Sequence, residues 1–94
     1  PETGEVAGIS VSETSVEVYV DRYGKLSVGL GIGEKETTTP LLLREKLSRV
    51  MIDHPETSVS IFGDKKVEYQ SIVSVMDICR ESGIKSISIV AVED

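Results

Sequence analysis

The stretch that decides the fold runs from Ser58 to Asp94 and reads SVSIFGDKKVEYQSIVSVMDICRESGIKSISIVAVED. Apolar and polar residues alternate over Val59–Phe62, which predicts a half-buried strand. Apolar residues recur at helical spacing over Tyr69–Glu81, and Gly83 follows where a glycine commonly ends a helix. Ser86–Val92 predicts a second strand. Strand, helix and strand in about 34 residues form a βαβ unit with parallel strands.

The upstream half predicts a hairpin and a first helix. Val16–Val20 and Lys25–Leu30 alternate around a short turn at Gly24, as the two strands of a β-hairpin do. Thr39 is placed to cap a helix that starts at Pro40 and stops near Asp53, ahead of Pro55. The apolar residues of this helix share one face, which predicts that they pack on the sheet: Leu43, Leu47, Val50 and Met51.

Together these segments predict an α+β fold, a two-layer α/β sandwich in ββαβαβ order with a mixed sheet and two helices on one face. We expect residues 1–12 to form a flexible N-terminal linker or a swapped strand, and residues 13–94 to form the domain. Ser86–Val92 is apolar on nearly both faces. That pattern suits a central strand or a strand that pairs again with a partner.

Composition excludes several classes of protein. The 94 residues suffice for one domain, and a formal charge of −6 disfavours binding to nucleic acid or anionic lipid. One cysteine, Cys79, and one histidine, His54, rule out an intrachain disulfide and a cysteine-based zinc site. We therefore expect no metal and no cofactor. No apolar run approaches 18 residues, so no membrane helix is predicted, and Pro1 indicates an excised segment of a longer protein.

Catalytic interpretations of the sequence are weak. The glycines of GLGIG at residues 29–33 lack the Lys-Ser/Thr pair of a phosphate loop and better suit a flexible strand end. Asp64 with Tyr69, or Asp77 with Arg80, could form acid–base pairs. A turn residue and a helical surface pair are the simpler interpretations. Cys79 lies on the apolar stripe of its helix and is expected in the core. The chain is not predicted to be an enzyme.

Three motifs in order resemble one family. Ile61–Tyr69 reads IFGDKKVEY, Ile72–Met76 reads IVSVM, and Ser82–Ile87 reads SGIKSI. They are similar to the periplasmic domain of the ExbD/TolR family, which has G-D-K-x-V-x-Y after a strand and then V-V-x-V-M in a helix. Val18–Leu26 resembles the family's hairpin, and the spacing of Leu43 and Leu47 matches its first helix. Ser82 replaces the usual Ala, and the final strand departs from a common Leu-x-Thr ending.

The resemblance implies a protein with a short cytoplasmic tail, one membrane helix and this periplasmic domain, at the periplasmic face of the bacterial inner membrane. With an ExbB/TolQ-like partner such proteins form a channel driven by the proton motive force. Their proton-binding Asp lies in the membrane helix, outside this chain. The implied role of the domain is to form a homodimer and to couple to a TonB/TolA-like protein or the cell wall. TonB, Tol and gliding systems all remain open.

Strand edges are the predicted interfaces, for dimerisation or partner binding through an added strand: Val6, Ile9, Val11, Ile87, Ile89, Val90 and Val92. Proline at Ile89 is expected to abolish pairing of the last strand. Gly63, Asp64 and Tyr69 carry the motif turn, in which Asp64 is expected to fix the turn and Tyr69 to pack at the start of the helix. The alternative function is a small ligand- or peptide-binding regulatory domain of ferredoxin-like shape, which needs a pocket between helices and sheet or at a dimer seam.

Overall fold

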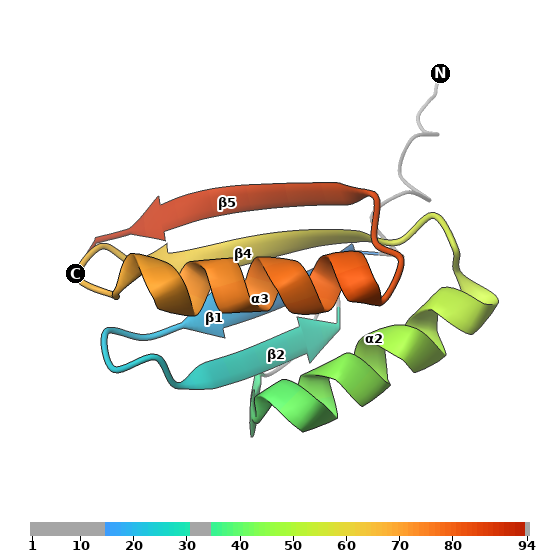
Figure 1. The fold of residues 1–94 in the computed structure, drawn as a ribbon, viewed down its shortest axis with the longest axis horizontal. Coiled ribbons are helices and arrows are strands. Elements are labelled where there is room, and N and C mark those ends of the chain that lie inside the picture. Colours follow the sequence, from blue (N-terminus) through green and yellow to red (C-terminus); the bar gives the residue numbers. More distant parts are fainter. Residues whose placement is uncertain (1–14, 31–34, 94) are drawn as a thin grey trace, which may run out of the picture.

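A mixed sheet carries two helices on one of its faces (Figure 1). The computed structural model describes residues 15–30 and 35–93. In chain order the elements are β1 (Ser15–Val20), β2 (Leu26–Leu30), β3 (Glu36–Thr38), α2 (Pro40–Asp53), β4 (Ser58–Asp64), α3 (Tyr69–Glu81) and β5 (Ser86–Val92). The predicted α+β class, the mixed sheet and the placement of both helices are confirmed.

The strands lie in the order β3-β2-β1-β4-β5. β2 pairs antiparallel with β1 and with β3, while β4 pairs parallel with β1 and with β5. The hairpin and the βαβ unit are therefore both present. β3 was missed by the sequence interpretation, because three residues are too few to show a period. Among the described residues, β5 lies at an edge of the sheet. Of its two interpretations, a central strand or a strand that pairs again with a partner, the first is therefore wrong.

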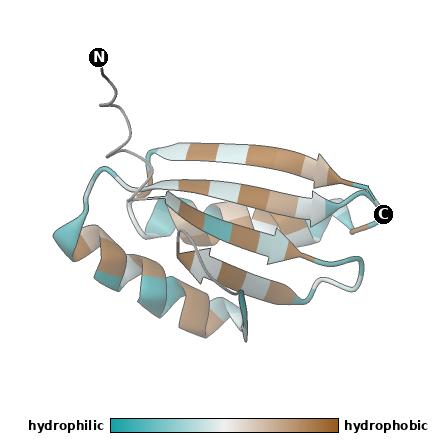
Figure 2. Cartoon of the chain, turned by 180° about the vertical axis from the view of Figure 1, so that it is seen from behind, coloured by the Kyte–Doolittle hydropathy of each residue, from teal (hydrophilic) through white to brown (hydrophobic). Residues whose placement is uncertain are grey.

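The core lies between the sheet and the helices. It contains the alternate apolar residues of β1, β2 and β4 and the inward faces of α2 and α3, including Leu43, Leu47, Ile72, Val75 and Cys79. Cys79 is fully buried, as expected. The opposite face of the sheet is left uncovered by the helices (Figure 2).

Local rules set the ends of the helices. Leu42 N–H donates to the Thr39 hydroxyl oxygen at 3.2 Å, so Thr39 caps α2 as predicted. Gly83 follows α3 with φ of +95°, and Gly24 turns the hairpin with φ of +85°, conformations that favour glycine. His54 ends α2 and is exposed. Within residues 15–30 and 35–93, no helix is long and apolar enough to cross a membrane.

Candidate functional site

The outer edge of β5 presents backbone hydrogen-bonding groups that face away from the sheet. Lys65 N–H donates to the Val92 carbonyl oxygen at 3.0 Å, and Asp64 is in register with Val92. In a parallel pair the N–H and C=O of one residue point to the same side, and those of the next residue point to the other. The backbone N–H and C=O groups that point toward β4 are therefore those of Ser86, Ser88, Val90 and Val92. The backbone groups of Ile87, Ile89 and Ala91 point outward.

The two edges of the sheet differ in how they are protected. β3 has only three residues, two of them exposed, and Glu36 lies 3.9 Å from the Lys46 ammonium. β5 has seven residues, SISIVAV, without a charge or a proline. Short, charged edges resist pairing with another chain, whereas long uncharged edges favour it. β5 is thus the edge suited to receive a further strand.

Apolar side chains flank the β5 edge on both faces. Ile89 is 52% exposed on the helix side, where α3 covers β4 more fully than β5, and Val90 is 41% exposed on the open side. A groove of about 230 Å³ runs between the start of α3 and β5, lined by residues that include Val67, Tyr69, Ile72, Ile89 and Ala91. An added strand would therefore contact apolar surface with both sets of its alternating side chains.

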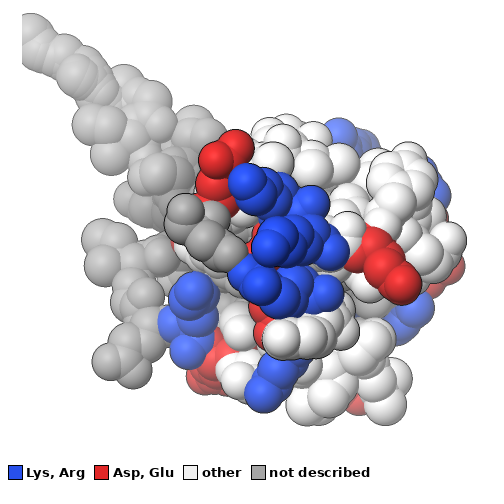
Figure 3. Space-filling view, turned by 90° about the vertical axis from the view of Figure 1, so that its left-hand side faces the viewer, with Lys and Arg blue, Asp and Glu red and all other residues white. Residues whose placement is uncertain are grey.

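The motif turn shapes the neighbouring end of the sheet. Asp64 Oδ1 accepts a hydrogen bond from Lys66 N–H at 2.8 Å, so Asp64 fixes the turn as predicted. Asp64 Oδ2 also lies 3.8 Å from the Arg22 guanidinium in the β1–β2 turn. The prediction that Tyr69 packs at the start of the helix is wrong: Tyr69 begins α3 but is 79% exposed. Lys and Arg side chains gather over this end of the molecule (Figure 3).

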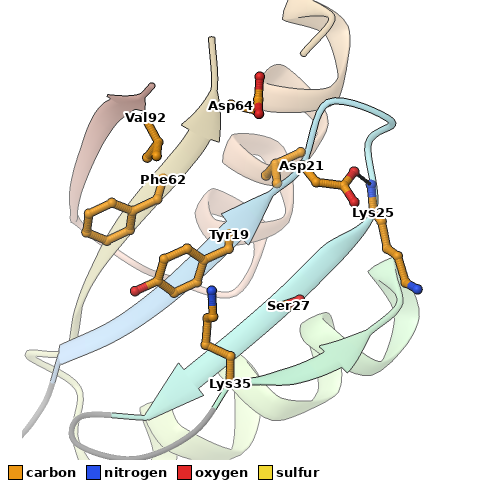
Figure 4. Close-up of a pocket in the computed structure, with 9 residues that line it drawn as sticks. Tyr19, Asp21, Lys25, Ser27, Lys35, Phe62, Asp64 and Val92 are labelled. Carbon is orange, nitrogen blue, oxygen red and sulfur yellow. Dashed lines mark hydrogen bonds between the residues drawn. The ribbon is translucent and has the colours of Figure 1, made fainter. Parts of the chain in front are cut away.

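An aromatic row crosses the open face of the sheet (Figure 4). The Tyr19 and Phe62 rings stack with centroids 4.9 Å apart, and the Lys35 ammonium lies 4.0 Å from the Tyr19 centroid. The Tyr19 hydroxyl donates to Glu17 Oε1 at 2.7 Å, and this hydrogen bond, with burial and the Glu17 charge, raises the Tyr19 pKa. Both faces of the Tyr19 ring are covered, so the row is not a stacking platform for sugars or bases.

The structure brings together no catalytic group among the residues it describes. Arg80 and Asp77 form the exposed ion pair expected one helical turn apart on α3. Burial raises the pKa of the Cys79 thiol to about 11, which disfavours the nucleophilic thiolate. Across residues 15–30 and 35–93, no three His, Cys, Asp or Glu side chains are grouped to hold a metal ion.

Small cavities do exist. The one between α3, the hairpin and the start of α2 is about 130 Å³, lined by residues such as Gly24, Pro40 and Ser71. This is below the usual size of a small-molecule pocket, roughly 300–1,000 Å³.

The structure places the predicted site residues in two groups. Ile87, Ile89, Val90 and Val92 lie on the free edge strand, and Gly63 and Asp64 lie beside its C-terminal end. Val6, Ile9 and Val11 lie outside the described residues. The sequence interpretation missed the basic side chains of the hairpin turn, because only the strand pairing brings them next to the motif turn.

One family model matches the whole chain. The model described as "ExbD: Biopolymer transport protein ExbD/TolR" covers residues 1–94. No curated protein matches the chain significantly.

Proposed function

Because the chain belongs to the ExbD/TolR family of biopolymer transport proteins, we propose that it is the periplasmic domain of an energy-transducing complex driven by the proton motive force. Members of this family are transport components and not enzymes. The domain would form a homodimer and couple the complex to a TonB/TolA-like protein or to the cell wall. Its location would be the periplasmic face of the bacterial inner membrane.

Within residues 15–30 and 35–93, no strand pairs with the outer edge of β5, and this observation supports the proposed role. Ile87, Ile89 and Ala91 offer outward backbone groups along a seven-residue uncharged strand. A strand from a second copy or from a partner can pair there through main-chain hydrogen bonds, while the flanking apolar side chains supply specificity. Such pairing needs no catalytic group and no cofactor.

The sheet also supports a route for mechanical force. β1 pairs with β4 over six residues, and β4 pairs with β5 over seven, both in parallel. A pull applied at Ser15 along β1 would load these hydrogen bonds in shear, so many bonds would share the force. The load would pass from β1 through β4 to whatever pairs with β5.

The proposed complex requires a second membrane protein. We place the contact with an ExbB/TolQ-like partner in a membrane helix that is not part of these 94 residues, together with the residue that carries the proton. No residue of this chain is then assigned to proton transfer. The chain's own contribution is the pairing edge and the sheet that holds it.

Proline at Ile89 tests the proposal. Ile89→Pro removes an outward N–H, so association should weaken by about tenfold or more, measured by sedimentation equilibrium. Ile89→Thr is the matched control, because it keeps the N–H and suits a strand. If Ile89→Pro associates like the unsubstituted chain, β5 is not the pairing edge. The same pair of variants should be compared in capture of a TonB/TolA-like partner.

A further inference from the structure

Four basic residues lie in the two loops at the end of the sheet toward which β1, β4 and β5 run. Val20 is in register with Gly63, so the residues that follow each strand leave the sheet side by side. Arg22 and Lys25 come from the hairpin turn, and Lys65 and Lys66 from the loop before α3. We call these four residues the basic end. Figure 3 shows Lys and Arg side chains gathered over this end of the molecule, with Asp and Glu side chains beside them.

Two carboxylates at the basic end, those of Asp21 and Asp64, are engaged by backbone groups. Asp21 Oδ1 accepts from Tyr23 N–H and from Lys25 N–H, both at 2.9 Å. The Asp64 side chain is 15% exposed, against 35% for its neighbour Arg22. The Lys65 side chain is 51% exposed, and its ammonium lies 3.9 Å from Glu93. The Glu93 side chain is itself 74% exposed, so the basic end is a group of cations with an exposed carboxylate beside Lys65, on a chain with a formal charge of −6.

A shallow hollow adjoins the basic end on the open face of the sheet. It measures about 200 Å³ and is lined by Asp21, Lys25 and Asp64 together with the apolar surface of Tyr19, Phe62 and Val92, among others. Figure 4 shows Tyr19, Phe62 and Val92 along it and the Asp64 carboxylate at its end. A hollow of this size accepts one apolar side chain rather than a large ligand.

We propose that the basic end is a docking site for an acidic protein segment whose carboxylates meet Lys65, Lys66 and Arg22, and whose apolar side chain enters the adjoining hollow. Opposite charges across such a surface steer association and set its register. An extended anionic membrane fits less well, because a chain of net charge −6 is repelled by a continuous negative surface and the hollow would stay unfilled.

This docking site is distinct from the pairing edge of β5. The outward backbone groups of Ile87, Ile89 and Ala91 play no part in it. Loss of pairing in Ile89→Pro should therefore leave binding at the basic end unchanged, so the two proposals fail independently.

A fluorescent octapeptide with four Glu residues around a central Leu is the probe, and its anisotropy is the measurement. The double variant Lys65→Glu, Lys66→Glu should bind the peptide about tenfold more weakly, because each reversal replaces attraction by repulsion. The matched control is Arg49→Glu, Lys85→Glu, which changes the net charge equally at exposed positions on α2 and before β5. The control should bind within about twofold of the unsubstituted chain.

Several outcomes would overturn the proposal. Equal losses in the two double variants would mean that only net charge matters. Undiminished binding in Lys65→Glu, Lys66→Glu would place the peptide elsewhere. Vesicles of phosphatidylglycerol that bind through Lys65 and Lys66 when the peptide does not would assign the basic end to the membrane. Thermal unfolding of both variants checks that the fold is kept, and replacement of the peptide's Glu by Gln should abolish binding.

Discussion

Gly63 links the motif turn to the core. A Cβ atom at this position would lie 2.7 Å from Ile72 Cδ1, closer than side chains approach one another. Ile72 is 8% exposed and belongs to the core cluster, so its Cδ1 atom has closely packed neighbours. The glycine of the G-D-K motif is thus explained by the close packing of α3 on β4.

Gly63→Ala should lower the free energy of unfolding by about 1–2 kcal/mol, since overpacking outweighs the smaller entropy of the unfolded chain. Gly29→Ala is the matched control. Among the described residues, its Cβ would contact Lys35 Cγ at 3.9 Å, so stability should be unchanged or rise by up to about 1 kcal/mol. Urea unfolding measures both. Equal stabilities of the two variants would contradict the proposed packing.

Cys79 should make stability depend on alkaline pH. Its pKa is raised by burial from 9.0 to about 11 in the folded chain, so the folded state holds this proton more tightly than the unfolded state. The stabilisation is complete below pH 9 and is lost as the pH rises toward 11, by about 2 kcal/mol. Between pH 9 and pH 11, the free energy of unfolding should fall by about 2 kcal/mol more in the unsubstituted chain than in the Cys79→Ala variant. Urea unfolding measures both. If the stability of the two chains fell in parallel as the pH rises, the pKa of the Cys79 thiol would not be raised in the folded chain.

At the scale of elements, β5 has two chemically different sides. The backbone N–H and C=O groups of its even-numbered residues form hydrogen bonds with β4. Those of its odd-numbered residues point outward. The sequence predicts that proline at Ile89 abolishes pairing of the last strand, but this geometry leads us to expect that the pairing of β5 with β4 is kept. Ile89 N–H points away from β4, and edge strands tolerate proline at such positions.

Proline at adjacent positions of β5 should thus have opposite consequences. Val90→Pro removes an N–H that faces β4 and should destabilise the chain by about 3 kcal/mol or more. Ile89→Pro should cost about 1 kcal/mol or less in the unassociated chain. Thermal unfolding of dilute samples distinguishes the two. A larger loss for Ile89→Pro would mean that the assigned register of β5 is shifted by one residue.

At the scale of the whole molecule, the sheet is asymmetric. One edge is the short, charged strand β3, and the other is the longer, uncharged strand β5. The basic end lies where β1 and β4 end. The two surfaces that we propose for contacts with other proteins therefore lie at one edge and at one end of the sheet.

Amide hydrogen exchange should alternate along β5. In dilute solution Ser88, Val90 and Val92 should exchange slowly and Ile87, Ile89 and Ala91 fast, because only the first set bonds to β4. Association at the edge should slow the second set by at least about tenfold. NMR exchange rates at two protein concentrations test this. Uniform rates along the strand at both concentrations would contradict pairing at this edge.

The elements of the fold could be read from the sequence because their causes are local. A period of two or of 3.6 residues, a capping Thr39 and a helix-ending Gly83 act within a few residues of their own positions. The seven-residue span of β5 and the 13-residue span of α3 were therefore predicted at their observed bounds. β3 was the exception, since its three residues are extended only because β2 lies beside them.

The candidate site was only partly predictable. The sequence by itself determined that Ser86–Val92 is an apolar strand, because side-chain pattern reports what each face contacts. It could not determine whether that strand is central or at an edge, because the order of apolar and polar side chains does not report which strands its backbone bonds to. Strand order placed β5 at an edge of the described sheet, and the pairing of Val20 with Gly63 brought two basic loops to the same end. Both facts depend on contacts between residues far apart in the chain, which form only when the sheet is assembled.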